Sequence, residues 1–172
     1  MCGIVGYIGK NKDIKLGLTA LKRLEYRGYD SAGLAVFNSE KNKIFHLKKA
    51  GRIDNLEREI LNNNFAQELQ GSPSIFHTRW ATHGGVSDEN AHPHCDCQQN
   101  IWLVHNGIVE NYKELKETLQ KEGHQFTSET DTEVLAHLIE KHFEGNLETA
   151  VRKALKSVKG TYGLVIIARD DP

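Results

Sequence analysis

The first nine residues constrain this chain more than any other stretch, because a cysteine directly follows the initiator methionine at the start of an apolar segment. Cys2 is followed by glycine and then by the residues Ile-Val-Gly-Tyr-Ile-Gly. β-branched and aromatic residues of this kind favour a buried strand. We therefore expect Cys2 to stand at the mouth of a strand. Removal of Met1 would leave it with a thiol and a free α-amine on one Cα.

A thiol and an amine on the same residue form a useful chemical pair. A nucleophile needs a base within hydrogen-bond reach, and an N-terminal amine can serve its own side chain, usually through a water. The ordinary pKa is about 8 for an α-amine and about 8.5 for a thiol, so both protons are mobile near neutrality. Cys2 would then need no histidine as base. The alternative is that Cys2 is a small buried residue that happens to follow the first methionine.

Length and charge indicate a single domain without a nucleic-acid or membrane partner. The chain has 172 residues, with 22 basic and 23 acidic side chains and a formal net charge of -1. No apolar run approaches the length of a membrane span, and no signal peptide is recognisable. The three cysteines are an odd number, and two of them are separated by one residue. That is a poor disulfide framework, so we expect reduced thiols and a cytoplasmic protein.

The hydrophobic pattern predicts an α+β domain with helices layered on antiparallel sheet. Two strands, 32–37 and 43–47, are expected to form a hairpin, and Asn106-Gly107 is expected to break a strand that begins at Ile101. Capping boxes are expected at Asn111 and at 130–133, which would place Asp131 in the first turn of a helix. The other predicted elements are helices over 11–24, 54–65, 112–121 and 146–158, and strands over 74–79 and 162–168.

Polar residues gather in four clusters, at 27–33, 77–85, 90–97 and 105–111, each at a strand end or in a loop, where sites are commonly built. Arg79 beside Trp80 suggests recognition of a carboxylate, because guanidinium is a planar two-pronged donor and the indole can shield the pair from water. Asn106-Gly107 could supply a side-chain amide and a backbone N–H to an oxyanion, and Asp131 could accept an ammonium group. The alternatives are surface packing, an ordinary turn and a structural helix start.

The segment His92-Pro93-His94-Cys95-Asp96-Cys97 contains ligand types that suit zinc, but its spacing does not. Paired zinc ligands are usually two to four residues apart, whereas alternation along an extended segment would send the histidines and cysteines to different faces. We therefore expect no metal in this segment. Its histidines are expected to be hydrogen-bonding loop residues, and its two cysteines buried small ones.

Six motifs together resemble the glutaminase domain of the glucosamine-6-phosphate synthase family, whose members are class II, N-terminal-nucleophile amidotransferases. The motifs are MCGIVGYIG at 1–9, LEYRGYDSAG at 24–33, HTRWATHG at 77–84, NAHPH at 90–94, VHNGIVENY at 104–112 and SETDTEV at 128–134. They occur in the family's order, and the resemblance covers essentially the whole chain. The resemblance implies an αββα sandwich, two antiparallel sheets between helix layers.

The resemblance also implies roles for individual residues. Cys2 would be the nucleophile that attacks the side-chain amide of L-glutamine, with its own α-amine as general base. Asn106 and the backbone of Gly107 match the family's oxyanion hole. Arg79 matches the residue that binds the glutamine α-carboxylate, and Asp131 the one that holds its α-ammonium. Other pocket positions fall on Trp80, Thr82, His83 and His92, with Arg27 beside the nucleophile. No cofactor is implied.

The same resemblance implies a larger enzyme. Residues 1–172 would be a glutaminase domain that is incomplete at its C-terminus, which could leave 162–168 as an unpaired sheet edge. The sugar-isomerase domains, through which the family's homo-oligomeric enzymes use fructose 6-phosphate, would lie outside this chain. One departure is Gly85-Val86-Ser87, where the family usually has a proline. The alternatives are another class II amidotransferase, a non-catalytic glutamine sensor or a metal-binding loop domain.

Overall fold

The structure is a computed structural model that describes residues 2–10, 12–62, 65–81 and 84–172. The strands of the described residues are β1 (Gly3–Tyr7), β2 (Ser31–Asn38), β3 (Lys43–Ala50), β4 (Ser74–Arg79), β5 (His94–Cys95), β6 (Ile101–Val109) and β7 (Gly160–Ala168). The α-helices are α1 (Lys15–Lys22), α2 (Ile53–Asn62), α3 (Tyr112–Lys121), α4 (Glu133–His142) and α5 (Leu147–Leu155). Two short 3₁₀ turns, Glu25–Arg27 and Phe65–Gln67, complete the elements.

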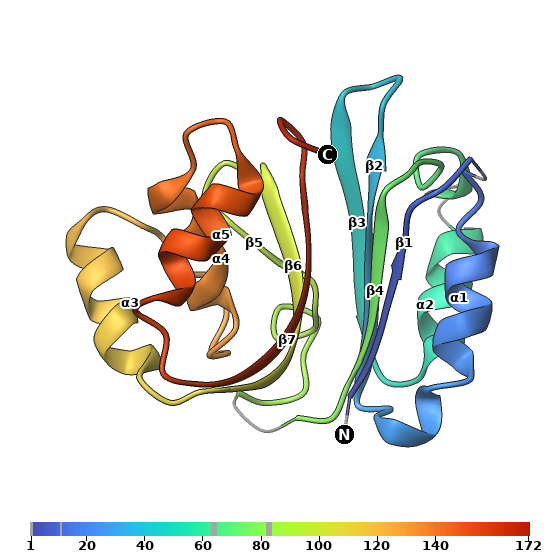
Figure 1. Ribbon diagram of the computed structural model, residues 1–172. Helices are drawn as coiled ribbons and strands as arrows, with labels where there is room; N and C mark the ends of the chain where they lie inside the picture. Colours follow the sequence, from blue (N-terminus) through green and yellow to red (C-terminus); the bar gives the residue numbers. More distant parts are fainter. Residues whose placement is uncertain (1, 11, 63–64, 82–83) are drawn as a thin grey trace.

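Two antiparallel sheets form the centre of the described structure. One has the strand order β1-β4-β2-β3 and the other the order β5-β6-β7. Figure 1 shows the sheets facing each other, with α1 and α2 on the outer side of the first sheet and α3, α4 and α5 on the outer side of the second. This is the αββα sandwich that the family resemblance implies, and it agrees with the α+β domain predicted from the hydrophobic pattern. The edge position predicted for the last strand is also found, since β7 pairs with β6 along one side.

Side chains alternate between the two faces of a strand, and this alternation along the central strands explains the four layers of the sandwich. In β2, Leu34 and Val36 pack with α1 and α2, while Ala35 and Phe37 belong to the core between the sheets. β6 shows the same alternation: Ile101 and Leu103 face the helices of the second sheet, and Trp102 and Val104 face the first sheet. A strand that is apolar on both faces must be covered on both sides. The sheets therefore stack, and each recruits its own helices.

Several local predictions are wrong. Asn106-Gly107 does not break its strand, because β6 continues to Val109 with Gly107 at a φ of 142°. Asn111 does not cap α3; its side chain accepts from Lys159 N at 2.9 Å and donates to Ser157 O at 2.9 Å. Its amide therefore joins the start of β7 to the end of β6.

The second capping box is also absent. α4 begins at Glu133, so Asp131 precedes the helix, and Thr132 makes no side-chain cap. The Glu133 carboxylate instead accepts from the backbone of Thr127 and Ser128, at 2.8 and 2.7 Å. By contrast, Asn146 accepts from Thr149 N at 2.8 Å and caps α5 at the predicted start of that helix.

Most of the predicted helices and strands are present, and the differences between prediction and structure lie mainly at their ends. α1 is shorter than the predicted helix, β3 runs three residues further than predicted, and the short strand β5 lies within a segment predicted to be a loop. Within the described ranges, none of the helices has the length and apolarity required to cross a bilayer.

Candidate active site

Cys2 lies at the end of β1 nearest the loop that follows β4. The register pairs Gly3 with Thr78, and Gly3 N donates to Thr78 Oγ1 at 3.1 Å. The Cys2 sulfur accepts a hydrogen bond from Trp80 N at 3.2 Å. A Cβ on Gly3 would lie 2.7 Å from Leu24 Cβ, so a glycine after the cysteine lets the first strand pack closely against the end of α1.

A cavity of about 330 Å³ opens beside Cys2, a volume in the range of small-molecule sites. Its walls come from both sheets and from the segment that precedes α4. The lining residues are Cys2, Arg27, Arg79, Trp80, His92, His105, Asn106, Gly107, Thr130, Asp131 and Thr132. The four sequence clusters and the start of the chain therefore meet at one place, as the positions of the predicted strand ends indicate.

The Asn106 amide has a fixed orientation next to Cys2. His77 Nε2 lies 3.0 Å from Asn106 Oδ1, and Asn106 Nδ2 donates to Cys2 O at 3.0 Å. The adjacent Gly107 has a φ of 142°, and a Cβ there would lie 2.0 Å from Thr161 O. A glycine is required at this position because an L side chain would be both strained and in collision with β7. The Asn106 amide donor therefore lies at the Cys2 end of the cavity.

Arg79 is the buried cation of the cavity. Its side chain is 4% exposed, and its guanidinium donates to Gly85 O at 3.1 Å and to Gly84 O at 3.3 Å. Burial lowers the pKa of Arg79 below its ordinary value, which the neighbouring Cys2 and Asp131 partly offset. The two carbonyls hold the guanidinium against the loop that contains Gly84 and Gly85 (the glycine loop), at the wall of the cavity.

Asp131 supplies the opposite charge. Its carboxylate is almost fully buried, and Oδ2 accepts a hydrogen bond from Val109 N at 2.8 Å. Arg79 and Asp131 both line the cavity. An anion site and a cation site in one cavity are what an α-amino acid, with its carboxylate and ammonium, requires.

The histidines around the cavity are neutral at pH 7. Burial lowers the pKa of His77 to about 4, and it lowers the pKa of His92 well below the ordinary value. The pKa of His105 is also lowered, chiefly by burial. His77 stacks on His92 at 4.1 Å between ring centroids, and His92 Nδ1 accepts from His105 N at 3.3 Å. These rings therefore orient their neighbours by hydrogen bonds, as predicted for the histidines of the 92–97 segment.

The structure brings most of the predicted site residues together. Cys2, Arg27, Arg79, Trp80, His92, Asn106, Gly107 and Asp131 all line the cavity. Thr82 and His83 lie outside the described residues. Trp80 is 45% exposed and meets the edge of Tyr29 at 5.4 Å between ring centroids.

Sequence reasoning did not single out several residues that shape the cavity. Thr130, Thr132 and His105 are lining residues, and Asn90 ties the glycine loop in place, because its amide donates to Gly85 O at 3.1 Å and accepts from Glu129 N at 2.9 Å. The only indication of these residues in the sequence was that they lie within the polar motifs. The burial predicted for Cys95 and Cys97 is wrong, because Cys97 is exposed and Cys95 is only half-buried.

Comparison with known proteins places this geometry in a family. A family model described as a glutamine amidotransferase domain matches residues 77–172. The chain is 54% identical over its whole length to the glutamine–fructose-6-phosphate aminotransferase (isomerizing) of Pyrococcus horikoshii, of which it covers 28%. It is 50% identical to the enzyme of the same name from Thermotoga maritima and covers 27% of it. The chain thus spans little more than a quarter of these relatives.

Solved structures with the same fold are more distant in sequence. The glutamine phosphoribosylpyrophosphate amidotransferase of B. subtilis superposes with a TM-score of 0.79 at 28% identity, over 98% of this chain and 35% of the other. A second structure, described as the allosteric regulatory enzyme of purine biosynthesis, gives a TM-score of 0.80 at 30% identity, over 98% of this chain and 36% of the other. Together with the match over more than half of its residues, these similarities show that the chain belongs to the glutamine amidotransferase domain family, with the N-terminal-nucleophile sandwich fold.

Proposed function

We propose that this chain is the glutaminase part of a glutamine–fructose-6-phosphate aminotransferase. The observation that carries the proposal is the convergence of Cys2, Asn106, Arg79 and Asp131 on one cavity. The cavity offers a thiol at one end and a cation and an anion for an amino-acid backbone. The higher identity to fructose-6-phosphate aminotransferases than to phosphoribosylpyrophosphate amidotransferases favours the aminosugar reaction over that of the other class II enzymes.

The chemistry is acyl transfer through a thioester. The Cys2 sulfur, deprotonated by its own α-amine after removal of Met1, attacks the side-chain amide carbon of glutamine. The carbonyl oxygen becomes an oxyanion held by Asn106 and the Gly107 N–H. The C–N bond then breaks, and the amine returns the proton so that ammonia leaves. Water hydrolyses the γ-glutamyl thioester, which releases glutamate and restores the thiol.

Arg79 and Asp131 orient the substrate for that attack. The guanidinium pairs with the α-carboxylate and the aspartate with the α-ammonium, so the side-chain amide points toward Cys2. Such positioning contributes to rate because the reacting atoms are held at attack distance. In the full-length enzyme, ammonia would pass to fructose 6-phosphate bound by sugar-isomerase domains, in a homo-oligomer in the cytoplasm.

The test is glutamate release from glutamine by the unsubstituted chain and by Cys2→Ala. Intact mass first establishes whether Met1 is removed. Activity in the unsubstituted protein and its loss in Cys2→Ala would support the proposal, and a γ-glutamyl adduct of Cys2 trapped by acid quenching would support the thioester. Equal activity in both proteins would overturn it. A chain that binds glutamine without cleaving it, with Met1 removed, would favour a non-catalytic sensor.

A further inference from the structure

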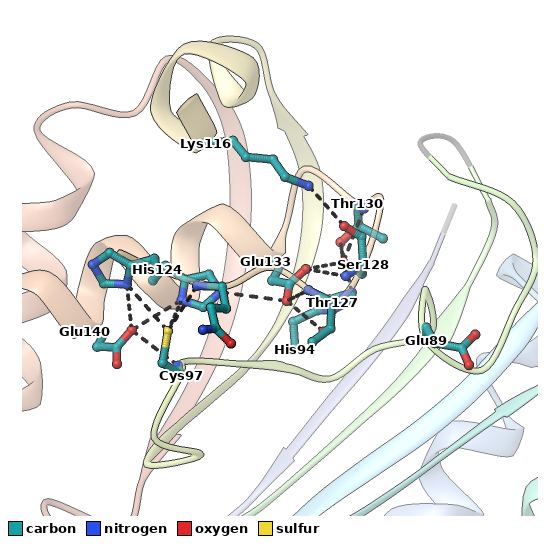
Figure 2. Close-up of polar contacts among 12 residues, drawn as sticks. Glu89, His94, Cys97, Lys116, His124, Thr127, Ser128, Thr130, Glu133 and Glu140 are labelled. Atoms are coloured by element: carbon teal, nitrogen blue, oxygen red, sulfur yellow. Dashed lines mark hydrogen bonds and ion pairs between the residues drawn. The ribbon is translucent and has the colours of Figure 1, made fainter. Parts of the chain in front are cut away.

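A second cluster of reactive side chains lies outside the catalytic cavity. It consists of Cys97, His124, His137 and Glu140, each of which offers one nitrogen, sulfur or oxygen atom, and these four atoms lie within 4.8 Å of one another. None of the four residues lines the cavity. Figure 2 shows Cys97, His124 and Glu140 pointing toward one another, away from the segment that carries Thr130. We propose that this cluster is a structural zinc site.

The distances fit a tetrahedral ion. With zinc–sulfur bonds of about 2.3 Å and zinc–nitrogen or zinc–oxygen bonds of about 2.0–2.1 Å, tetrahedral ligand atoms lie about 3.3–3.6 Å apart. The Cys97 sulfur is 3.5 Å from His137 Nδ1 and 3.8 Å from His124 Nδ1. Glu140 Oε2 is 2.9 Å from His124 Nδ1 and 3.3 Å from His137 Nδ1. These four of the six ligand-atom pairs are thus within about 0.4 Å of tetrahedral separations, and the other two are within 4.8 Å.

The ligand chemistry selects zinc. One thiolate, two imidazoles and one carboxylate form a mixed sulfur, nitrogen and oxygen set that suits Zn²⁺, whereas Mg²⁺ and Ca²⁺ prefer oxygen ligands. The negative charges of Cys97 and Glu140 together neutralise a divalent ion. Because all four positions are filled by protein atoms, the site is closed, as structural zinc sites are.

The surroundings of His137 support this assignment. Its ring is 1% exposed, and its Nε2 has no hydrogen-bond partner among the described residues but lies 3.7 Å from Glu133 Oε1. A carboxylate on the far nitrogen of a metal-binding imidazole fixes the tautomer that leaves the other nitrogen free to ligate. Glu133 is itself held by Ser128 and Thr127, as Figure 2 shows. Gln125 N donates to the Cys97 sulfur at 3.5 Å, which stabilises a thiolate.

A hydrogen-bonded network without metal is the alternative to this site. In it, the Cys97 thiol would donate to His137 Nδ1 at 3.5 Å, His124 Nδ1 would donate to Glu140 Oε2 at 2.9 Å, and His137 Nε2 would carry its proton toward Glu133. In the zinc site one ion replaces the protons of the thiol and of His124 Nδ1, so metal binding separates the two.

The proposed ion would join three separate segments. Cys97 follows β5, His124 follows α3, and His137 and Glu140 lie one turn apart on α4. The chain between His124 and α4 includes residues 127–132, which reach the catalytic cavity through Thr130 and Asp131. Zinc would therefore hold together His124 and α4, which flank the segment that completes the substrate site. Ligands contributed by three segments also explain why the spacing within 92–97 does not reveal the site.

The test is metal binding by the 172-residue chain in a Cys2→Ala background, which removes the thiol of the catalytic cavity and makes the result independent of glutaminase activity. Metal is first removed with a chelator, and zinc is then added back. After gel filtration, the zinc bound per chain is measured by mass spectrometry. We expect one equivalent of zinc, a rise in melting temperature on its addition, and a tetrahedral visible spectrum with a thiolate charge-transfer band when Co²⁺ replaces it.

Matched variants identify the ligands. Cys97→Ser should lose the thiolate band and bind zinc at least 100-fold more weakly, whereas Cys95→Ser, two residues away, should keep both. His124→Gln is the second ligand variant and should also weaken binding at least 100-fold, with circular dichroism confirming that each variant is folded. No stoichiometric zinc in the parent chain, or equal binding by Cys97→Ser and Cys95→Ser, would overturn the proposal.

Discussion

Asp131→Asn tests whether the buried carboxylate of the cavity binds the substrate's ammonium group. The substitution removes the charge but keeps the shape, and the new amide oxygen can still accept the hydrogen bond that Asp131 Oδ2 receives from Val109 N at 2.8 Å. The local fold should therefore persist. The loss should appear in substrate binding rather than in stability.

The expected magnitude follows from the site. Asp131 is 5% exposed, so water screens its interaction with an ammonium only weakly. A hydrogen bond between charged groups is worth about 1.5–3 kcal/mol, and each 1.4 kcal/mol is a factor of ten. We expect kcat/KM for glutamine to fall by about 10- to 150-fold in Asp131→Asn, mainly through a higher KM.

The assay compares two substrates. Glutamate release from glutamine is measured beside the hydrolysis of 4-carbamoylbutanoate, which has the same amide and carboxylate but lacks the α-amine. In the unsubstituted protein glutamine should be strongly preferred, and in Asp131→Asn that preference should nearly vanish. If both substrates lose activity by the same factor, Asp131 acts through the Val109 contact instead, and the assigned role is refuted.

Three further predictions concern the oxyanion donors, the packing of the first sheet and the buried imidazoles. Asn106→Ala should lower kcat for glutamine by about 100-fold with little change in KM, because its amide is needed when the oxyanion forms; a change confined to KM would contradict this. Gly33→Ala should lower the free energy of unfolding, measured by urea titration, by about 3 kcal/mol, because the new Cβ would lie 2.1 Å from His92 O. Gly163→Ala is the control: its Cβ would lie 3.8 Å from the nearest atom, so it should change the free energy of unfolding by under about 1 kcal/mol. Similar losses in the two variants would contradict the packing argument. The pKa of His77 falls from 6.5 to about 4 on folding, so the unfolded chain binds more protons between these values. The contribution of His77 to stability should be fully present above pH 6.5 and fall by roughly 2 kcal/mol between pH 7 and pH 5, in addition to the contributions of the other buried histidines. His77→Gln should make the pH dependence shallower by about this amount, and an unchanged pH dependence would be the contrary result.

The sequence by itself determined the kinds of element and, through the family resemblance, most of the residues that line the catalytic cavity. Alternation of apolar residues marked the strands, and periodicity of about 3.6 marked the helices, because each reports which face of an element is buried. The polar motifs lie at strand ends, and antiparallel strands bring such ends to a common edge. That is why the polar clusters could be expected to meet, whereas the grouping of Cys2, Arg79, Asn106 and Asp131 in one site was implied by the family resemblance.

Tertiary structure alone decided the partners of the polar side chains. The motif around Asn111 matches a capping box, yet its amide bonds to residues 157 and 159. Asp131 likewise bonds to Val109 N rather than opening a helix, and Cys97 meets imidazoles that are 27 and 40 residues away. A local sequence pattern indicates whether a residue has polar surroundings, but it does not identify the partner. A hydrogen-bond donor or a metal ligand can pair with any suitable group that folding brings within about 3 Å. Those groups come from segments far apart in the chain, and only the packed sheets and helices bring them together.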